Sequence, residues 1–240
     1  MRNEPLINTK QWTEGYIKVS ENSFLHRIRA YFQKKAFFDY VADKDKIILD
    51  VGCGNGGFIS LLDKMGYRNL YGVEPNEALL NYLWERNEKL ARDRIRKGFA
   101  TALPFEDEYF DCIYFFNVLH HLEDTNEYTK TIQETMRCLK PGGLMIAVEP
   151  CNAFIYSAMR AVSKALAPFS ELFSKIYAVI SEEQETLKYF FKHHFLLRDN
   201  LLALNCKILR DKRLLHQWSF VARKPSGAVN PKSTIHPGRR

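Results

Sequence analysis

The sequence has little that would direct the chain out of the cell or into a membrane. Its first residues, Met1–Pro5, lack the apolar core of a signal peptide. The longest nearly uncharged run, residues 141–159, contains Glu149, Pro150 and Asn152 and makes a poor membrane span. The five cysteines are scattered without a C-x-x-C pair, as expected for reduced thiols. We therefore expect a cytoplasmic protein with neither a disulfide framework nor a metal site.

The first part of the chain has almost no net charge, whereas the last part is strongly basic. Residues 1–150 hold 20 Lys and Arg against 22 Asp and Glu, a net charge of −2, whereas residues 151–240 hold 15 against 6, a net charge of +9. The first value makes nucleic-acid binding by the main body unfavourable, and the second leaves room for a basic patch that faces an anionic partner. Nothing in the composition indicates an oligomeric state.

A glycine-rich segment, residues 47–58, organises the chain. An uncharged apolar run leads to Asp50, four glycines follow within six residues (52, 54, 56 and 57), and an apolar pattern resumes at Phe58. This pattern predicts a buried strand, a tight turn and the start of a helix. Glycine lets a ligand approach the backbone of such a turn. The loop alone fits a nicotinamide cofactor as well as an adenosyl cofactor.

Short apolar segments alternate with segments of helical periodicity through residues 47–148. Repeated β-α units of this kind predict an α/β fold, in which a parallel sheet is covered by helices on both faces. The expected strands are 47–51, 70–73, 94–97, 111–116 and 144–148, and the expected helices are 57–65, 76–88 and 124–138.

The flanking segments predict a cover, an insert and a closing hairpin. We expect residues 1–224 to form a single domain, with 1–42 as an N-terminal helical cover, 152–180 as a helical insert and 225–240 as a disordered tail. Within these, residues 1–22 are expected to wrap the body loosely with some docking by Trp12 and Tyr16, 23–42 to be helical, and 152–180 to be broken at Pro168. A capping-box signature at Ser181 and Gln184 predicts a further helix to Phe191. Strands 206–210 and 214–222 are expected to pair across a link at 211–213.

Polar side chains follow the predicted strands at the edge where ligands of α/β sheets bind. Glu74 ends the second strand, 22 residues after Gly52, where a carboxylate can accept hydrogen bonds from both hydroxyls of a ribose; the alternative is a surface carboxylate at a helix N-terminus. Residues 98–105 could form a wall for an adenine or pack as an ordinary loop. Residues 117–122 bring Asn117, His120 and His121 to the same edge.

The chain is similar to the class I S-adenosylmethionine-dependent methyltransferases, in the small-molecule branch called type 11 or 12. The resemblance rests on ILDVGCGNGG (48–57), YGVEP (71–75), ATALPFEDEYFDCIYFFNVLHHL (100–122) and LKPGGLMIAVEP (139–150). It implies S-adenosyl-L-methionine as cofactor. It also implies a Rossmann-like, mostly parallel sheet of seven strands in the order 3-2-1-4-5-7-6, with the seventh strand antiparallel and residues 152–180 as a lid after the fifth strand.

The resemblance also implies roles for individual residues. The methionine part of the cofactor would lie on the backbone of residues 52–54, Asp50 would support the loop or approach the amino group, and Glu74 would bind the ribose. One departure is Phe99, which stands where the family often has an acidic residue bonded to adenine. The implied cofactor-binding residues are Asp50, Gly52, Cys53, Gly54, Glu74, Pro75, Ala100, Thr101, Asn117 and Val118.

Methyl transfer needs positioning above all, because the methyl group of a sulfonium is already activated. A base helps when the acceptor is a hydroxyl or an acidic carbon, and histidine titrates near neutral pH. His120 and His121 are the first candidates for this base, and Glu149 at the end of the fifth strand is the third. The alternative for each is a structural role, in capping a helix or in packing against the cofactor.

The acceptor has to be inferred from the segments that cover the sheet edge. Aromatic and apolar side chains of residues 1–40 and 152–180 predict a small or lipid-like acceptor that receives the methyl group on oxygen or carbon. Arg160, Lys164 and Lys175 could touch an anionic head group or a membrane surface; the alternative is that they are solvated while the apolar face packs on the sheet. The candidate lining residues are Tyr16, Tyr31, Phe154, Tyr156, Met159 and Tyr177.

Three other functions remain open on the sequence. An RNA methyltransferase would use the basic last third, although the −2 charge of the first 150 residues opposes it. A methyltransferase-like binding or regulatory module would keep the fold without catalysis, against which Gly52, Gly54 and Glu74 argue. A nicotinamide dehydrogenase would use the same glycine loop, but the segment 139–150 and the closing hairpin disfavour it.

Overall fold

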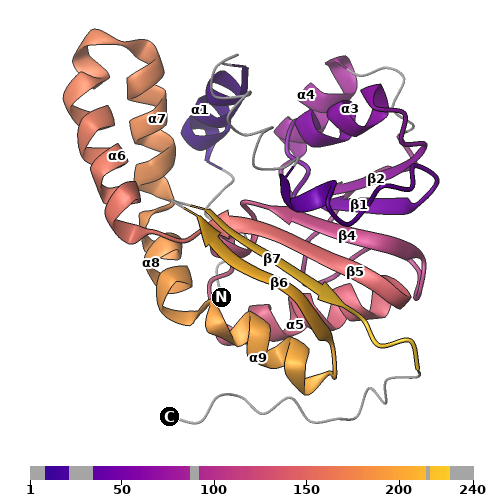
Figure 1. Cartoon of the computed structure of the whole chain (residues 1–240). Coiled ribbons are helices and arrows are strands. Elements are labelled where there is room, and N and C mark those ends of the chain that lie inside the picture. Colours follow the sequence, from indigo (N-terminus) through magenta and orange to yellow (C-terminus); the bar gives the residue numbers. More distant parts are fainter. Residues whose placement is uncertain (1–8, 22–34, 87–91, 215–216, 228–240) are drawn as a thin grey trace.

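A seven-stranded sheet runs through the middle of the molecule (Figure 1). The computed structural model describes residues 9–21, 35–86, 92–214 and 217–227. The strands lie in the order β3-β2-β1-β4-β5-β7-β6, with β7 antiparallel to both β5 and β6 and the other pairs parallel, which confirms the predicted fold. Their bounds are β1 Ile47–Val51, β2 Asn69–Glu74, β3 Ile95–Lys97, β4 Phe110–Phe116, β5 Leu139–Pro150, β6 Lys207–Leu214 and β7 Gln217–Arg223.

Helices cover both faces because the central strands are apolar on both sides. In β4, Ile113 and Phe115 join one buried cluster while Cys112 and Tyr114 join the other, since successive side chains of a strand point to opposite faces. The first cluster includes side chains of α5 (Thr125–Cys138), α8 (Gln184–His193) and α9 (Phe195–Ala203), and the second includes those of α3 (Gly57–Lys64) and α4 (Glu77–Arg86).

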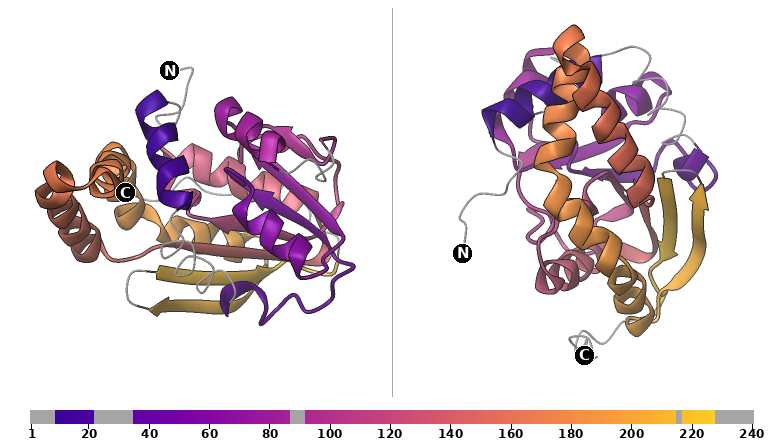
Figure 2. Two further views of the ribbon diagram at one scale, coloured as in Figure 1. Left: turned by 90° about the horizontal axis from the view of Figure 1, so that it is seen from above. Right: turned by 90° about the vertical axis from the view of Figure 1, so that its left-hand side faces the viewer.

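Three further helices stand beyond the carboxyl ends of the parallel strands. The helices α6 (Ala153–Leu166) and α7 (Glu171–Glu182) form a hairpin through the 3-10 turn η3 (Ala167–Phe169), as the break predicted at Pro168 requires. The N-terminal helix α1 (Lys10–Glu21) packs against α7 on its side toward α4 (Figures 1 and 2). Gly15 permits this approach, because a Cβ there would lie 2.9 Å from Cγ2 of Val179.

Several local predictions were wrong. Residues 10–21 are helical rather than a loose wrap, because Trp12 is buried against the helices beside it. The capping box does not form: Ser181 lies inside α7, and no side-chain hydrogen bond caps the first turn of α8. The helix α9 was not predicted. Most of the helix expected at 23–42 and most of the tail expected at 225–240 lie outside the described residues, which show a helical turn at 35–37.

The closing hairpin is longer than predicted. Residues 211–213 belong to β6, where Asp211 pairs with Phe220 and Arg213 with Trp218, and the strand continues to Leu214. The charged residues 211–213 were predicted to form a link because they are polar. They lie in an edge strand instead, where charged side chains discourage pairing with other chains. The fifth strand is also longer, since β5 begins at Leu139 and includes residues 141–143, with a shift in its register against β4.

Candidate functional site

The loop after β1 is held against the ends of β2 and β4. The N–H groups of Gly52 and Cys53 donate to the carbonyl of Val73, at 2.8 and 3.1 Å. Gly52 has a φ of 69°, and a Cβ there would lie 2.5 Å from Cγ2 of Val118. Glycine is therefore required at position 52 both by the backbone conformation and by the close approach of the segment that follows β4.

Glu74 joins the end of β2 to this loop. Its side chain is 4% exposed, so the alternative interpretation as a surface residue is wrong. The carboxylate accepts hydrogen bonds from the N–H of Gly54 at 2.9 Å and from the N–H of Asn76 at 3.0 Å. Burial raises the pKa of Glu74 to about 7, although these two hydrogen bonds favour the charged form. The structure thus brings Glu74 and the glycine loop together, as their spacing predicts.

The other predicted cofactor residues lie at the same edge of the sheet. Asp50 is buried below the loop, and its charge helps burial to raise the pKa of the Cys53 thiol. Pro75, Ala100 and Thr101 are half-buried. The N–H of Gly98 donates to the carbonyl of Glu74, which ties the loop after β3 to this region.

Asn117 carries a buried acceptor atom. Its φ is 54°, in the left-handed region that asparagine tolerates, and its N–H donates to the carbonyl of Val148 at 2.9 Å. Its side-chain oxygen Oδ1 is buried and has no hydrogen-bond partner among the described residues. A buried acceptor is costly without a donor, so this atom fits a donor group brought by a ligand.

Glu149 is fully buried at the end of β5 and has three hydrogen-bond partners. One oxygen accepts from the N–H groups of Val118 and Leu119, both at 2.8 Å, and the other bonds Nδ1 of His120 at 2.8 Å. The two N–H groups open the 3-10 turn η2 (Leu119–His121). Glu149 therefore caps this turn and orients the His120 ring.

His120 lies between two carboxylates. Its ring is 3% exposed, and its Nε2 faces Oε2 of Glu183 at 3.8 Å, on the side opposite Glu149. Burial alone would lower the pKa of His120, but hydrogen bonds to Glu149 and Glu183 and their charges raise it to about 9. His120 is therefore an imidazolium at neutral pH.

His121 differs from its neighbour. Burial and the adjacent His120 cation lower its pKa to about 3, so it is neutral. Its Nε2 lies 4.0 Å from Oε1 of Glu183, and its Nδ1 is buried without a partner among the described residues. Trp12 stands edge-on to the ring, with ring centres 6.1 Å apart.

Glu183 is the functional candidate that the sequence analysis missed. It lies between α7 and α8, and hydrogen bonding to the His120 imidazolium and to the Trp12 N–H keeps its pKa below the usual value against the effect of burial. Adjacent carboxylates at the start of a helix are ordinarily explained by the helix dipole. No spacing relates residue 183 to residues 120 and 121, so only the folded structure reveals the contact.

Ligand atoms of His120, His121 and Glu183 lie within 4.8 Å of one another, the arrangement that a divalent metal could use. The raised pKa of His120 favours the imidazolium, which has no lone pair left at Nε2. The same contacts also suit an ion-paired network.

The helix α1 covers this edge of the sheet. Trp12 donates its indole N–H to Glu183 at 3.0 Å, and Asn76 donates to the hydroxyl of Thr13 at 2.8 Å. The hydroxyl of Tyr16 lies 2.5 Å from where a Cβ of Gly54 would be. One helix thus contacts both the glycine loop and the histidine network.

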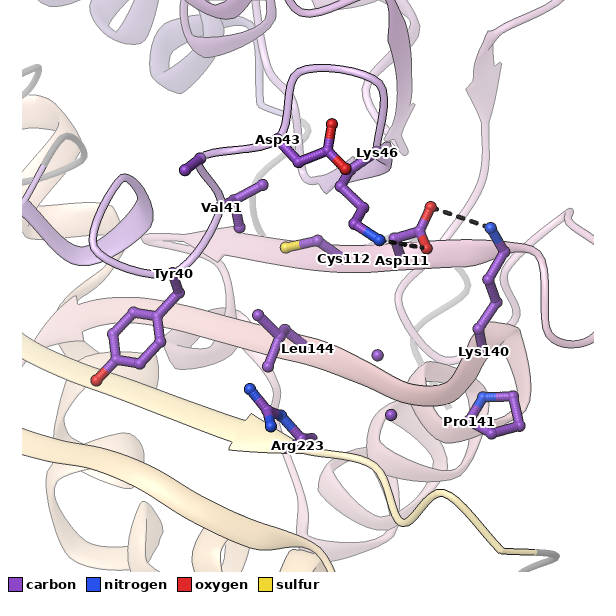
Figure 3. A pocket seen from close by; sticks show the side chains of 13 residues that line it. Tyr40, Val41, Asp43, Lys46, Asp111, Cys112, Lys140, Pro141, Leu144 and Arg223 are labelled. Carbon is purple, nitrogen blue, oxygen red and sulfur yellow. Dashed lines mark hydrogen bonds and ion pairs between the residues drawn. The ribbon is translucent and has the colours of Figure 1, made fainter.

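A cavity at the opposite end of the strands is separate from this site. It has a volume of about 300 Å³ and is lined near the starts of β1, β4 and β5 by residues such as Lys46, Asp111, Lys140 and Arg223 (Figure 3). Asp111 pairs with both lysines, at 3.5 and 3.0 Å. None of the predicted site residues lines it.

Known proteins resemble the chain in sequence and in fold. Residues 49–147 match a family model described as a methyltransferase domain. A demethylmenaquinone methyltransferase of Staphylococcus aureus is 28% identical over 162 residues, which are 65% of each chain; its counterpart in Staphylococcus saprophyticus is 30% identical over 145 residues, 58% of this chain and 60% of the relative. The chain therefore matches less than two thirds of the length of these relatives.

Solved structures share the fold. A SAM-dependent methyltransferase from Aquifex aeolicus superposes with a TM-score of 0.59 at 17% identity, over 88% of this chain and 97% of that one. The PH0226 protein of Pyrococcus horikoshii OT3 gives 0.60 at 20% identity, over 90% and 99%. The matched residues 49–147 include the glycine loop, Glu74 and the segment 117–121, and end two residues before Glu149.

Proposed function

We propose, on the premise that residues 49–147 form a class I S-adenosylmethionine-dependent methyltransferase domain, that the protein moves a methyl group from this cofactor to an oxygen or carbon of a small or lipid-like acceptor. The observation that carries the proposal is that the glycine loop, Glu74 and the Asn117 oxygen, which has no hydrogen-bond partner among the described residues, meet at one sheet edge. We further propose one domain over residues 1–224, in the cytoplasm, in keeping with five free cysteines.

The residues present suit the cofactor. Asn117 Oδ1 would accept from its ammonium group, Glu74 would accept from the ribose hydroxyls, and the backbone of residues 52–54 would lie along its methionine part. Pro75, Ala100 and Thr101 would flank the adenine. When bound, the cofactor supplies a methyl group activated by a positively charged sulfur.

We propose that His121 hydrogen-bonds an acceptor hydroxyl and takes its proton late in the transfer, because burial and His120 lower the pKa of its imidazole and make it a weak base. With its Nε2–H toward Glu183, its Nδ1 keeps a lone pair that has no partner among the described residues. Nδ1 would take the hydroxyl proton as the oxygen gains the methyl group, and Glu183 would stabilise the imidazolium that forms. Because Nδ1 is buried, the segments around this ring, among them α1 with Trp12, would have to move before an acceptor can approach.

His120 and Glu149 have positioning roles in this proposal. His120 already carries a proton at neutral pH, and Glu149 has its oxygens occupied by three donors, so neither suits a base. Together they hold the backbone of residues 118–120 in place. The His120 cation attracts the Glu183 carboxylate and so holds it beside His121.

An apolar acceptor fits the segments around the site. Tyr156 of α6 and Phe191 of α8 have ring centres 6.2 Å apart, and burial near Glu183 and Glu149 raises the pKa of the Tyr156 hydroxyl. The Staphylococcus relatives are named for a demethylmenaquinone acceptor. A hydrophobic ring compound is accordingly the first acceptor class to test.

Two measurements test the proposal. Calorimetric titration with S-adenosylhomocysteine should show binding, whereas no heat at high micromolar concentration, or binding of NADH instead, would refute it. Incubation with methyl-labelled cofactor and a lipid extract should then transfer label to an organic-soluble product. His121→Gln should lower this transfer about 10²-fold or more while leaving the affinity for S-adenosylhomocysteine unchanged.

A further inference from the structure

The helix α6 and the turn η3 expose an apolar face to solvent. Of the nine large hydrophobic side chains that are exposed among the described residues, five lie on this one segment. Phe154 is 79% exposed and Phe169 is 84% exposed, so the face extends from one end of the segment to the other. The five side chains are Phe154, Met159, Val162, Leu166 and Phe169. Clustering on this scale marks an interaction surface in a soluble chain.

The opposite side of α6 faces the protein. Ser163 is buried, and Tyr156 lies near Glu183 and Glu149 of the candidate site. Successive residues of a helix are 100° apart, which puts Tyr156 and Phe154 about 160° apart around the axis. The helix therefore has one side at the site and its apolar side turned outward, on a hairpin that projects from the sheet (Figures 1 and 2).

Charge indicates what the face contacts. From Pro150 to Ser170 the sequence has no Asp or Glu, and Arg160 and Lys164 are its charged residues. At 100° per residue, Arg160 and Lys164 each lie about 160° around the helix axis from Val162, on the polar side of α6, and no acidic residue of the segment offsets their charge. An anionic surface would attract these cations, and a helix with apolar residues on one side and Lys and Arg on the other is typical of a membrane interface.

We propose that α6 and η3 dock the protein on an anionic lipid bilayer, with Phe154, Val162 and Phe169 inserted at the level of the head groups. No described helix is long and apolar enough to cross a bilayer, so the contact is interfacial. The 14 residues of α6 are about 21 Å long, enough for both ends of the face to reach one flat surface.

Docking in this way would present the candidate site to its acceptor. The helix α6 begins at Ala153, four residues after Glu149, so the inserted face starts beside the histidine network. A lipid-like acceptor could then pass from the bilayer along α6 without crossing water. This inference rests on the proposed function for its purpose, whereas the bilayer contact itself can be measured independently.

Co-sedimentation of the full chain with vesicles tests the inference. Vesicles of phosphatidylcholine with 30% phosphatidylglycerol should bind the protein at least 10-fold more tightly than phosphatidylcholine alone. The double change Phe154→Ser and Phe169→Ser should weaken binding by at least 10-fold, and Lys164→Glu should weaken it several-fold. Phe195→Ser is the matched control, because it removes an exposed phenylalanine from α9 and should leave binding unchanged.

Two further measurements are needed to interpret the result: the affinity for S-adenosylhomocysteine shows whether each variant folds, and the molar mass in solution shows whether the chain dimerises. The serine variants should bind S-adenosylhomocysteine as the unchanged protein does, which shows that they fold. The docking proposal would be overturned if the protein does not bind vesicles, or if the double variant binds them as tightly as the Phe195→Ser control. Neither result would bear on the proposed function. A dimer that the double change dissociates would overturn it in favour of a second copy on this face.

Discussion

The indole N–H of Trp12 donates a hydrogen bond to the Glu183 carboxylate across 3.0 Å, joining residues that lie 171 positions apart in the sequence. The carboxylate also faces the imidazoles of His120 and His121. Through this bond the N-terminal helix α1 is attached to the same network that the proposed chemistry uses. Besides its packing on α7, the helix has a neutral hydrogen bond to Asn76 and exposed ion pairs, so this bond to a largely buried charge should be its strongest polar contact.

Trp12→Phe should therefore loosen α1 selectively. Loss of a hydrogen bond to a buried carboxylate costs about 1.5–3 kcal/mol. Amide hydrogen exchange in residues 10–21 should become at least 10-fold faster, while exchange in β4 and β5 stays unchanged. Mass spectrometry of peptic peptides measures both regions together. Equal protection of α1 in the two proteins would show that the Trp12 bond does not hold the helix.

Gly54→Ala should disable the cofactor loop. The φ of Gly54 is 56°, and its new Cβ would lie 2.5 Å from the Tyr16 hydroxyl. We expect the affinity for S-adenosylhomocysteine to fall at least 10-fold, with lower thermal stability. Gly57→Ala is the control, since residue 57 opens α3 and its Cβ would meet nothing closer than 3.6 Å. Similar losses in both variants would contradict a specific role for position 54.

Glu74 should give cofactor binding a pH dependence near neutrality. Its pKa in the folded chain is about 7, above the ordinary 4.5, so the group is protonated in weak acid and ionised in weak base. Only the ionised carboxylate accepts from both ribose hydroxyls, so the affinity for S-adenosylhomocysteine should rise as pH increases from 6 to 8. His120 and His121 have pKa values of about 9 and 3 and stay unchanged between these limits.

Glu74→Gln tests this assignment. The amide cannot titrate and donates where the carboxylate accepts, so binding should be about 10-fold weaker at pH 8 and nearly independent of pH. Calorimetric titration at pH 6, 7 and 8 provides the comparison. A pH dependence that persists in Glu74→Gln belongs to another group.

The parts of the fold that follow from local pattern were predictable from the sequence. Apolar runs placed the five parallel strands, and the glycine spacing with Glu74 predicted a loop and a carboxylate that do meet, through the Gly54 hydrogen bond. These features are encoded within single β-α units. The residues around each strand end therefore indicate the edge at which they will lie.

The rest depends on contacts between distant segments. Glu183 and Trp12 meet His120 and His121 only after four separate elements have packed, and no local period records that meeting. Similarly, the charges of residues 211–213 favour a turn in the sequence. That they lie in a strand follows only from the position of β6 at the edge of the sheet. The orientation of α6 is a third case. Its apolar periodicity predicts that one side of the helix is hydrophobic, but not whether that side packs on the protein or faces outward.

The imidazolium of His120 should make the stability of the fold fall in alkaline solution. Its pKa of about 9 in the folded chain exceeds the ordinary 6.5, so its contribution is complete below pH 6.5 and is lost as pH rises through 9. The difference corresponds to at most about 3 kcal/mol. Urea unfolding at pH 7 and pH 9.5 should show this loss in the unchanged protein and a smaller one in His120→Gln, with His193→Gln on α8 as the matched control. Imidazole chemical shifts of His120 give the same pKa without a variant, and a midpoint near 6.5 would refute the ion-paired network.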